Sequence, residues 1–284
     1  MNNNELLNLA LQAAELGGCE LKKYQDNVDP DSIETKRMGD WVSEADRASE
    51  NRILEFLQTS VPDHDILTEE TGYKRGNTKA EFRWIIDPLD GTTNFLRHFP
   101  VWAVSIAIER RVNPGAKWGE VVVGVINIPL RNEVFHAIKD QGSFRNGIRL
   151  KLKDNRAFNE SLLATGFPFR TRHLVDQYMK LFAELMKNCA DVRRAGAVAV
   201  DLCYVAAGIF DGFWELDLAP WDIAAGGLII SEAGGLVSNF QGGDDYLTTG
   251  DIVAGNISAY NELIHYVRKH FPDPRDVDKS PRLN

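Results

Sequence analysis

The sequence has few cysteines, no long apolar run and no excess of positive charge. Three of its 284 residues are cysteine, and Cys19, Cys189 and Cys203 are too widely spaced for a metal motif or a disulfide framework. No apolar stretch approaches the roughly 20 residues of a membrane span, and the N-terminus lacks the apolar core of a signal peptide. We therefore expect a cytoplasmic protein that does not associate with a membrane.

Other absences restrict the chemistry. The formal net charge of −9 gives no reason to expect direct nucleic-acid binding, and an anionic substrate would need a basic pocket or a bound metal. The six histidines form no ligand pair at helical spacing, which argues against zinc. The chain also lacks a Walker phosphate loop and a Gly-x-Ser-x-Gly nucleophile elbow.

Periodic apolar patterns predict a mixed α and β protein of one large domain or two moderate ones. Helical spacing is found over residues 4–26 and again from Ser43 to Val61, with a loop expected over residues 28–42. A short strand is expected over residues 65–68, followed by a polar loop over 72–80. Further strands are predicted over residues 101–108, 120–128 and 134–138, with tight turns near 141–142 and 145–147.

The pattern changes near residue 150. Beyond it, strands expected over residues 162–166, 212–216, 236–238 and 252–255 are interspersed with helices over 175–187, 197–207, 221–233 and 257–269. We therefore predict an α+β domain over residues 1–150 and an α/β domain over residues 151–271. Residues 272–284 contain three prolines among charged residues, which predicts a disordered tail.

The strongest chemical signal lies in the sequence WIIDPLDGTTNF, residues 84–95. A strand predicted over Phe82 to Ile86 leads into two carboxylates, Asp87 and Asp90. Pro88 is expected to end the strand, and the Gly-Thr-Thr-Asn run to form a turn whose free amides point outward. Carboxylates hold hard cations and amides hold phosphate, although this stretch alone also fits a plain Asp-Gly turn.

Further acids lie at the ends of predicted elements. Glu69 follows a strand, and Asp46 and Asp222 lie in the first turns of helices. Each alone fits a solvated loop or an acid that complements a helix dipole. If Glu69 and Asp222 converge with the central pair, carboxylates about 4 Å apart repel by about 4 kcal/mol and need a counter-charge. Oxygen-only ligands favour Mg²⁺, Mn²⁺ or Ca²⁺.

Several motifs follow one another between about residue 36 and residue 240. They are DWVSEAD at 40–46, Glu69-Glu70, the stretch at 84–95, RRAG at 193–196 leading to Asp201, PWDIAAG at 220–226 and EAGG at 232–235. Together they resemble the inositol monophosphatase family of Mg²⁺-dependent, lithium-sensitive phosphatases, and most closely its bacterial SuhB-type branch. The resemblance implies the layered αβαβα sandwich of the sugar phosphatases, a group that includes fructose-1,6-bisphosphatase.

The resemblance also implies a metal centre with two to three Mg²⁺ ions, for which Mn²⁺ could substitute. Glu69, Asp87 and the carbonyl of Leu89 would hold one ion, and Asp87, Asp90 and Asp222 a second. A third, weaker ion would lie beside Glu69. Two ions about 4 Å apart can clamp the attacking and leaving oxygens of a phosphate ester.

The remaining matched residues are assigned to catalysis and substrate binding by the resemblance. Asp46 and Thr92, with Glu69 close by, would position and activate the attacking water. The substrate would be bound by the backbone amides of Gly91 and Thr92 and by Thr93, Gly196, Ala197 and Glu215. Lys36 is expected near the entrance of the site, and Trp41 stands where many family members have a smaller residue.

The expected function is Mg²⁺-dependent hydrolysis of inositol 1-phosphate, a small-molecule phosphate monoester, by a homodimer. A fructose-1,6-bisphosphatase or another sugar or nucleotide phosphatase is the alternative, although Thr93-Asn94 favours the inositol branch over bisphosphate nucleotidases. A second hypothesis is a protein-binding module, since SuhB-type relatives are linked to transcription antitermination complexes. A third is a structural Ca²⁺ site in an inert scaffold.

Overall fold

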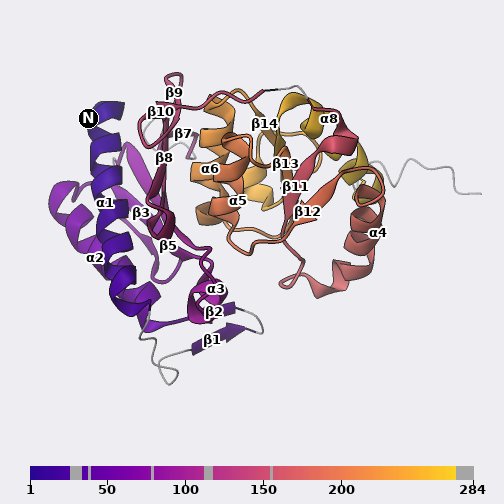
Figure 1. Cartoon of the computed structure of the whole chain (residues 1–284). Helices are drawn as coiled ribbons and strands as arrows, with labels where there is room; N and C mark the ends of the chain where they lie inside the picture. Colours follow the sequence, from indigo (N-terminus) through magenta and orange to yellow (C-terminus); the bar gives the residue numbers. More distant parts are fainter. Residues whose placement is uncertain (26–33, 38–39, 78–79, 112–117, 154–155, 273–284) are drawn as a thin grey trace, which may run out of the picture.

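Helices and sheets alternate in five layers in the computed structural model, which describes residues 1–25, 34–37, 40–77, 80–111, 118–153 and 156–272. Helices α1 (Asn3–Tyr24) and α2 (Glu44–Ser60) cover the outer face of the first sheet. Helices α5 (Val198–Ala206) and α6 (Pro220–Glu232) lie between the two sheets, and α4 (Val175–Leu185) and α8 (Ile257–His270) cover the second sheet (Figure 1). The predicted αβαβα arrangement is confirmed.

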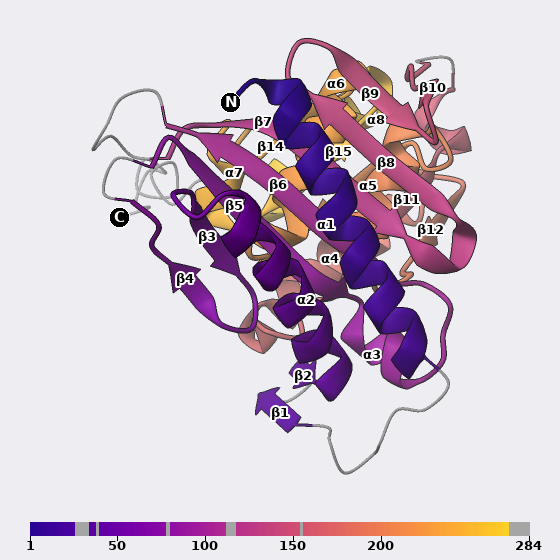
Figure 2. The same cartoon turned by 90° about the vertical axis from the view of Figure 1, so that its left-hand side faces the viewer.

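The first sheet has eight strands in the order β10-β9-β8-β7-β6-β5-β3-β4. Their bounds are β3 (Asp65–Thr68), β4 (Gly72–Lys74), β5 (Phe82–Asp90), β6 (Ala103–Arg110), β7 (Glu120–Ile128), β8 (Glu133–Ile138), β9 (Gly142–Arg145) and β10 (Ile148–Arg149). Figure 2 shows α1 lying across the face of this sheet. Strands β3 and β5 run parallel, and the other pairs are antiparallel. Glu69 and the central pair of acids, Asp87 and Asp90, therefore lie at the carboxyl ends of these two parallel strands.

The second sheet has five strands in the order β12-β11-β13-β15-β14. They are β11 (Leu162–Thr165), β12 (Asp191–Arg193), β13 (Gly212–Glu215), β14 (Leu236–Ser238) and β15 (Ile252–Gly255). Strand β11 is parallel to β12 and β13, and β15 is antiparallel to β13 and β14. The first-sheet strands fall within residues 65–149 and the second-sheet strands within 162–255; the division into two domains at residue 150 stays a prediction.

Several short elements differ from the predictions. Part of the expected loop over residues 28–42 is an antiparallel pair, β1 (Glu34–Arg37) and β2 (Asp40–Val42), and β4 lies in the loop expected over 72–80. The sequence also gave no sign of β12 or of the helix α7 (Tyr246–Thr249), nor of the 3₁₀ turns η2 (Pro129–Arg131), η3 (Phe158–Glu160) and η4 (Arg172–Leu174). Such segments are too short to show a period. The expected tail lies, from residue 273 onward, outside the described residues.

Pro88 does not end β5, so that prediction was wrong. The strand continues to Asp90 with a shift in register, because Asp87 pairs with Ser105 but Asp90 pairs with Ala103. Three residue steps on β5 therefore oppose two on β6, which is a β-bulge, and a bulge tolerates a residue that has no N–H to donate. The Ser49 hydroxyl donates to the Pro88 carbonyl at 2.9 Å and ties the bulge to α2.

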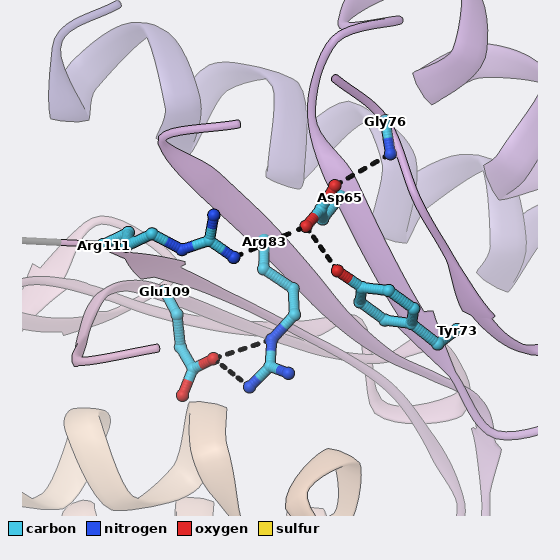
Figure 3. Close-up of polar contacts among 6 residues, drawn as sticks. All are labelled: Asp65, Tyr73, Gly76, Arg83, Glu109 and Arg111. Atoms are coloured by element: carbon cyan, nitrogen blue, oxygen red, sulfur yellow. Dashed lines mark hydrogen bonds and ion pairs between the residues drawn. The ribbon is translucent and has the colours of Figure 1, made fainter. Parts of the chain in front are cut away.

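At the opposite end of the same strands, buried charges are paired (Figure 3). Asp65 accepts hydrogen bonds from the Tyr73 hydroxyl at 2.5 Å and the Gly76 N–H at 2.8 Å, and it lies 3.8 Å from the guanidinium of Arg111. Arg83 donates from Nε to Glu109 at 2.9 Å and also contacts it through Nη2. Each acid at this end thus has a cation beside it.

Helix α6 packs tightly against the first sheet at Gly124. Residues on every face of α6 are buried, as expected for a helix between two sheets. A Cβ built on Gly124 would lie 2.9 Å from the backbone oxygen of Ala225 and 3.1 Å from its Cα. Because these are backbone atoms of α6, the helix itself would have to move, and α6 carries Asp222 in its first turn.

We expect Gly124→Ala to lower the free energy of unfolding by about 1–3 kcal/mol, because overpacking of a core costs that much. The reduced entropy of the unfolded chain acts in the opposite direction but contributes only about 0.4–1 kcal/mol. Thermal unfolding followed by circular dichroism measures the net effect. A midpoint equal to or above that of the parent protein would show that α6 has room at this position.

Candidate active site

A cavity of about 490 Å³ opens where the carboxyl ends of β5 and β13 approach the first turn of α6. That volume is in the range of small-molecule sites, about 300–1,000 Å³. Its walls come from both sheets and include almost every residue assigned to the site from the sequence: Glu69, Asp87, Leu89, Asp90, Gly91, Thr92, Thr93, Gly196, Ala197, Glu215 and Asp222. The structure thus brings these residues together, while the role of each stays a prediction.

Asp46 lies behind the cavity wall and reaches it through Thr92. It is buried in the first turn of α2, where its carboxylate accepts a hydrogen bond from the Ser43 N–H at 2.8 Å and thereby caps the helix. The Thr92 hydroxyl donates to the other carboxylate oxygen of Asp46 at 2.9 Å. Burial raises the pKa of Asp46 to about 6 despite these hydrogen bonds.

A left-handed glycine turns the chain from β5 into the short helix α3 (Thr92–Leu96). Gly91 has φ of 91°, a conformation that side chains rarely permit, and a Cβ there would lie 3.1 Å from that of Ala197. The Asn94 side-chain amide donates to the carbonyls of Val101 at 2.7 Å and Ala195 at 2.9 Å. Asn94 therefore holds the loop that contains Gly196 and Ala197 against the end of β5.

The two acids of the central stretch are deeply buried. Asp90 accepts hydrogen bonds from the N–H groups of Val198 at 3.2 Å and Ala199 at 2.7 Å, at the start of α5. Burial and the charge of Asp222 nevertheless raise the pKa of Asp90 to about 8. Burial, followed by the charges of Glu69, Asp90 and Asp222, raises the pKa of Asp87 well above its ordinary value.

The charge balance at this edge differs from that elsewhere in the molecule. Away from the cavity, four buried carboxylates lie beside arginines, namely Asp65 with Arg111, Glu109 with Arg83, Glu133 with Arg145 and Asp211 with Arg156. Within the described part of the chain, Asp87 and Asp90 form no ion pair with lysine, arginine or histidine. Buried acids that repel one another in a cavity are typical of a functional site.

The donor set fits a hard divalent cation, because it consists of carboxylate oxygens whose mutual repulsion a cation would cancel. As the side chains lie, no three His, Cys, Asp or Glu residues in the described ranges form a group that could hold an ion. The carboxylates are turned toward internal partners instead: Asp87 toward the Leu89 N–H at 3.0 Å, and Asp222 toward the Ala219 N–H at 2.7 Å. An ion would have to displace some of these contacts.

The second sheet contributes Glu215, the last residue of β13, to the cavity wall. A Cβ on Gly166 would lie 1.9 Å from the Glu215 carboxylate, so this close approach requires glycine. Burial raises the pKa of Glu215 to about 8, although Arg194 lowers it. Asp201 on α5 also lines the cavity, and its buried Oδ1 has no hydrogen-bond partner among the described residues.

Comparison with known proteins adds to this geometry. The model of the inositol monophosphatase family matches residues 2–271. The chain belongs to the inositol monophosphatase family. This family is generally metal-dependent, with Mg²⁺ as its ion, which agrees with the donor set of the cavity.

Similar proteins extend over almost the whole chain. A protein of Escherichia coli strain K12 named Nus factor SuhB is 42% identical over 270 residues, which are 94% of this chain and 97% of that protein. The crystal structure of the extragenic suppressor protein SuhB of Bartonella henselae has a TM-score of 0.86 at 37% identity and covers 93% of this chain and 99% of its own. An inositol monophosphatase structure from Anabaena has a TM-score of 0.81 at 35% identity, covering 95% and 97% respectively.

Sequence reasoning missed the wall between β11 and α4. Arg170 and Arg172 line the cavity together with Phe167 and Phe169. The sequence FPFRTR, residues 167–172, places two arginines directly after a strand in an acidic protein, which was a usable signal. The side chain of Lys36, which was expected near the entrance, and the side chain of Trp41 lie outside what the structure describes.

We expect the metal-free protein to lose stability as the pH rises from about 4 to about 8. The raised pKa values of Asp46, Asp90 and Glu215 mean that the folded protein binds more protons than the unfolded chain in this interval, so unfolding becomes easier with pH. Thermal unfolding in the presence of a chelator measures the slope, and Asp90→Asn should flatten it. A metal-free midpoint that rises over this interval would contradict the charge distribution described above.

Proposed function

We propose that the protein is a Mg²⁺-dependent phosphomonoesterase that hydrolyses inositol 1-phosphate to inositol and phosphate. The observation that carries this proposal is the gathering of Glu69, Asp87, Asp90 and Asp222 at one cavity, where Asp87 and Asp90 lack ion-pair partners among the described residues. Membership of the inositol monophosphatase family supports the reaction class. The reaction needs an enzyme, since phosphate-monoester hydrolysis is among the slowest uncatalysed reactions.

Two to three Mg²⁺ ions would be held by Glu69, Asp87, the Leu89 carbonyl, Asp90 and Asp222, with Mn²⁺ as a substitute. When bound, such ions lower the pKa of water and neutralise charge on the phosphate. The backbone N–H groups of Gly91 and Thr92, at the turn into α3, would donate to phosphate oxygens; both residues line the cavity. The protein's own groups would thus hold the ions and orient the ester, and the ions would balance its charge.

Asp46 and Thr92 are the residues that would handle the attacking water. The Thr92 hydroxyl gives its hydrogen bond to Asp46, which leaves the Thr92 oxygen lone pairs to accept a hydrogen bond from water. Asp46 is in turn held by Ser43, so the pair is fixed before substrate arrives. Glu69, which lines the same cavity, would stand close to the water.

The second half of the chain would select the alcohol part of the substrate. Glu215 lies in the cavity wall formed with Gly166, and its carboxylate can accept hydrogen bonds from sugar or polyol hydroxyls. Thr93, Gly196 and Ala197 line the same cavity and would also contact the alcohol part of the substrate. A polyol such as inositol, with a hydroxyl on every unphosphorylated carbon, matches a wall of this polarity.

We expect Asp87→Asn to reduce kcat/KM for Mg²⁺-dependent phosphate release from inositol 1-phosphate by more than about 100-fold, since removing even the outer partners of metal ligands costs about 10–100-fold. The assay compares inositol 1-phosphate, fructose 1,6-bisphosphate and a nucleotide 3′-phosphate, with and without lithium, which should inhibit. Glu109→Gln, a buried carboxylate at the opposite end of the sheet, is the matched control and should retain activity. Faster turnover of the nucleotide would reject the inositol branch.

We also propose an association with the transcription machinery, because relatives at 42% identity carry the name Nus factor SuhB. Surface residues would form that contact. Asp87→Asn separates the two roles: a cell that depends on the antitermination role should grow normally with this variant, even though phosphatase activity is lost. Loss of growth together with activity would instead make the enzyme reaction the only cellular role supported. The homodimer expected from the family remains a proposal.

Among the described residues, no helix has the length and apolar character needed to span a membrane. We propose that the protein works in the cytoplasm, in agreement with its unpaired cysteines.

A further inference from the structure

We propose that Arg170 is an internal counter-cation of the acid cluster, paired with Asp222 when no metal is bound and displaced from it when a divalent ion arrives. Arg170 Nη1 lies 3.7 Å from Asp222 Oδ2. The same carboxylate oxygen accepts the Ala219 N–H at 2.7 Å. This inference rests on the proposed function, because it takes Asp222 to be a metal ligand.

The strand and turn that lead to Arg170 are held by buried contacts. In the preceding strand and turn, the Thr165 hydroxyl donates to the Trp214 carbonyl at 2.7 Å, and the Tyr178 hydroxyl donates to the Gly166 carbonyl at 2.6 Å. Phe167 packs edge-on against the ring of Tyr178, with 6.1 Å between centroids. These contacts anchor the chain three residues before Arg170, and both Phe167 and Arg170 line the cavity.

The side chain of Arg170, by contrast, is partly open to solvent. It is 31% exposed, whereas the side chain of Asp222 is 9% exposed. A long, solvent-facing arginine can change rotamer without disturbing the core. Moving it would uncover the carboxylate of Asp222 without any movement of α6.

Electrostatics explains why such a residue is useful. Without an ion, Asp222 adds to the repulsion acting on Asp87 and Asp90. A single positive charge at Asp222 offsets part of that repulsion, and a divalent ion offsets more of it while also accepting oxygen ligands. The two cations cannot both occupy the same face of one carboxylate. Arg170 should thus stabilise the metal-free protein and weaken the apparent affinity for metal.

The test is isothermal titration calorimetry of the full-length protein with Mn²⁺ alone, at low ionic strength and without substrate. Arg170→Gln should lower the apparent Kd for Mn²⁺ about two- to fivefold, the range expected for losing one partly exposed ion pair. Arg170→Lys, which keeps the charge, should remain near the parent value. The metal-free Tm should fall in Arg170→Gln, and the increase in Tm caused by saturating Mn²⁺ should be larger than in the parent.

Arg156→Gln is the matched control, because Arg156 pairs with buried Asp211 at 3.0 Å and lies outside the cavity. It should change the Tm but leave the Kd for Mn²⁺ unchanged. An unchanged or higher Kd in Arg170→Gln, with Mn²⁺ binding intact in the parent, would overturn this inference alone. A parent protein that binds no Mn²⁺ would overturn the proposed function, and this inference with it.

Discussion

The structure depends on one electrostatic constraint, which is that buried carboxylates repel each other unless something positive stands among them. At one end of β3 and β5 the protein meets this constraint with arginines, as Asp65 with Arg111 and Glu109 with Arg83 show. At the other end it leaves the acids facing a cavity. The same two strands therefore have one end where the acids are paired with arginines and another end where the acids line a cavity. That asymmetry is the physical reason for placing a metal-dependent reaction at the second end.

The local backbone brings the carboxylates of Asp87 and Asp90 to the same cavity. An ordinary strand would place Asp87 and Asp90, three residues apart, on opposite faces of the sheet. The bulge at Pro88 adds one residue and changes that alternation, so both carboxylates line the same cavity. Gly91 then reverses the chain without a Cβ penalty, and Gly91, Thr92 and Thr93 line the same cavity. Pro88 and Gly91 thus set the path of the backbone, and Asp87 and Asp90 supply the negative charge.

Much of the fold could be predicted from the sequence because its main elements are long and periodic. Helices α1, α2 and α8 lie within a few residues of the predicted ranges. The bulge at Pro88 was missed because proline usually marks the end of a strand. Proline is also tolerated at a bulge, and the sequence does not distinguish the two cases. Strands β1, β2, β4 and β12 were missed because three or four residues show no period. No local pattern places Arg170 beside Asp222, because their contact exists only once β11 and α6 pack together.

The convergence of the acids was predictable in a different way. Asp46, Glu69 and Asp222 each had an ordinary local explanation, and capping of α2 by Asp46 is indeed present in the structure. Only the family motifs suggested that these residues meet. Capping of α2 leaves Asp46 able to contact a residue of the cavity wall, since one of its oxygens accepts from Ser43 and the other from Thr92.

Asp90 shows most clearly how the two sheets and the site depend on each other. Its carboxylate belongs to the first sheet, yet it accepts the N–H groups of Val198 and Ala199, more than 100 residues later in the chain. It therefore caps α5, where a negative charge is favoured by the helix dipole, and fixes that helix against β5. Any ion that draws Asp90 toward the cavity must act against this cap. If Asp90 holds an ion as proposed, metal binding and the packing of α5 on the first sheet would be linked through a single side chain.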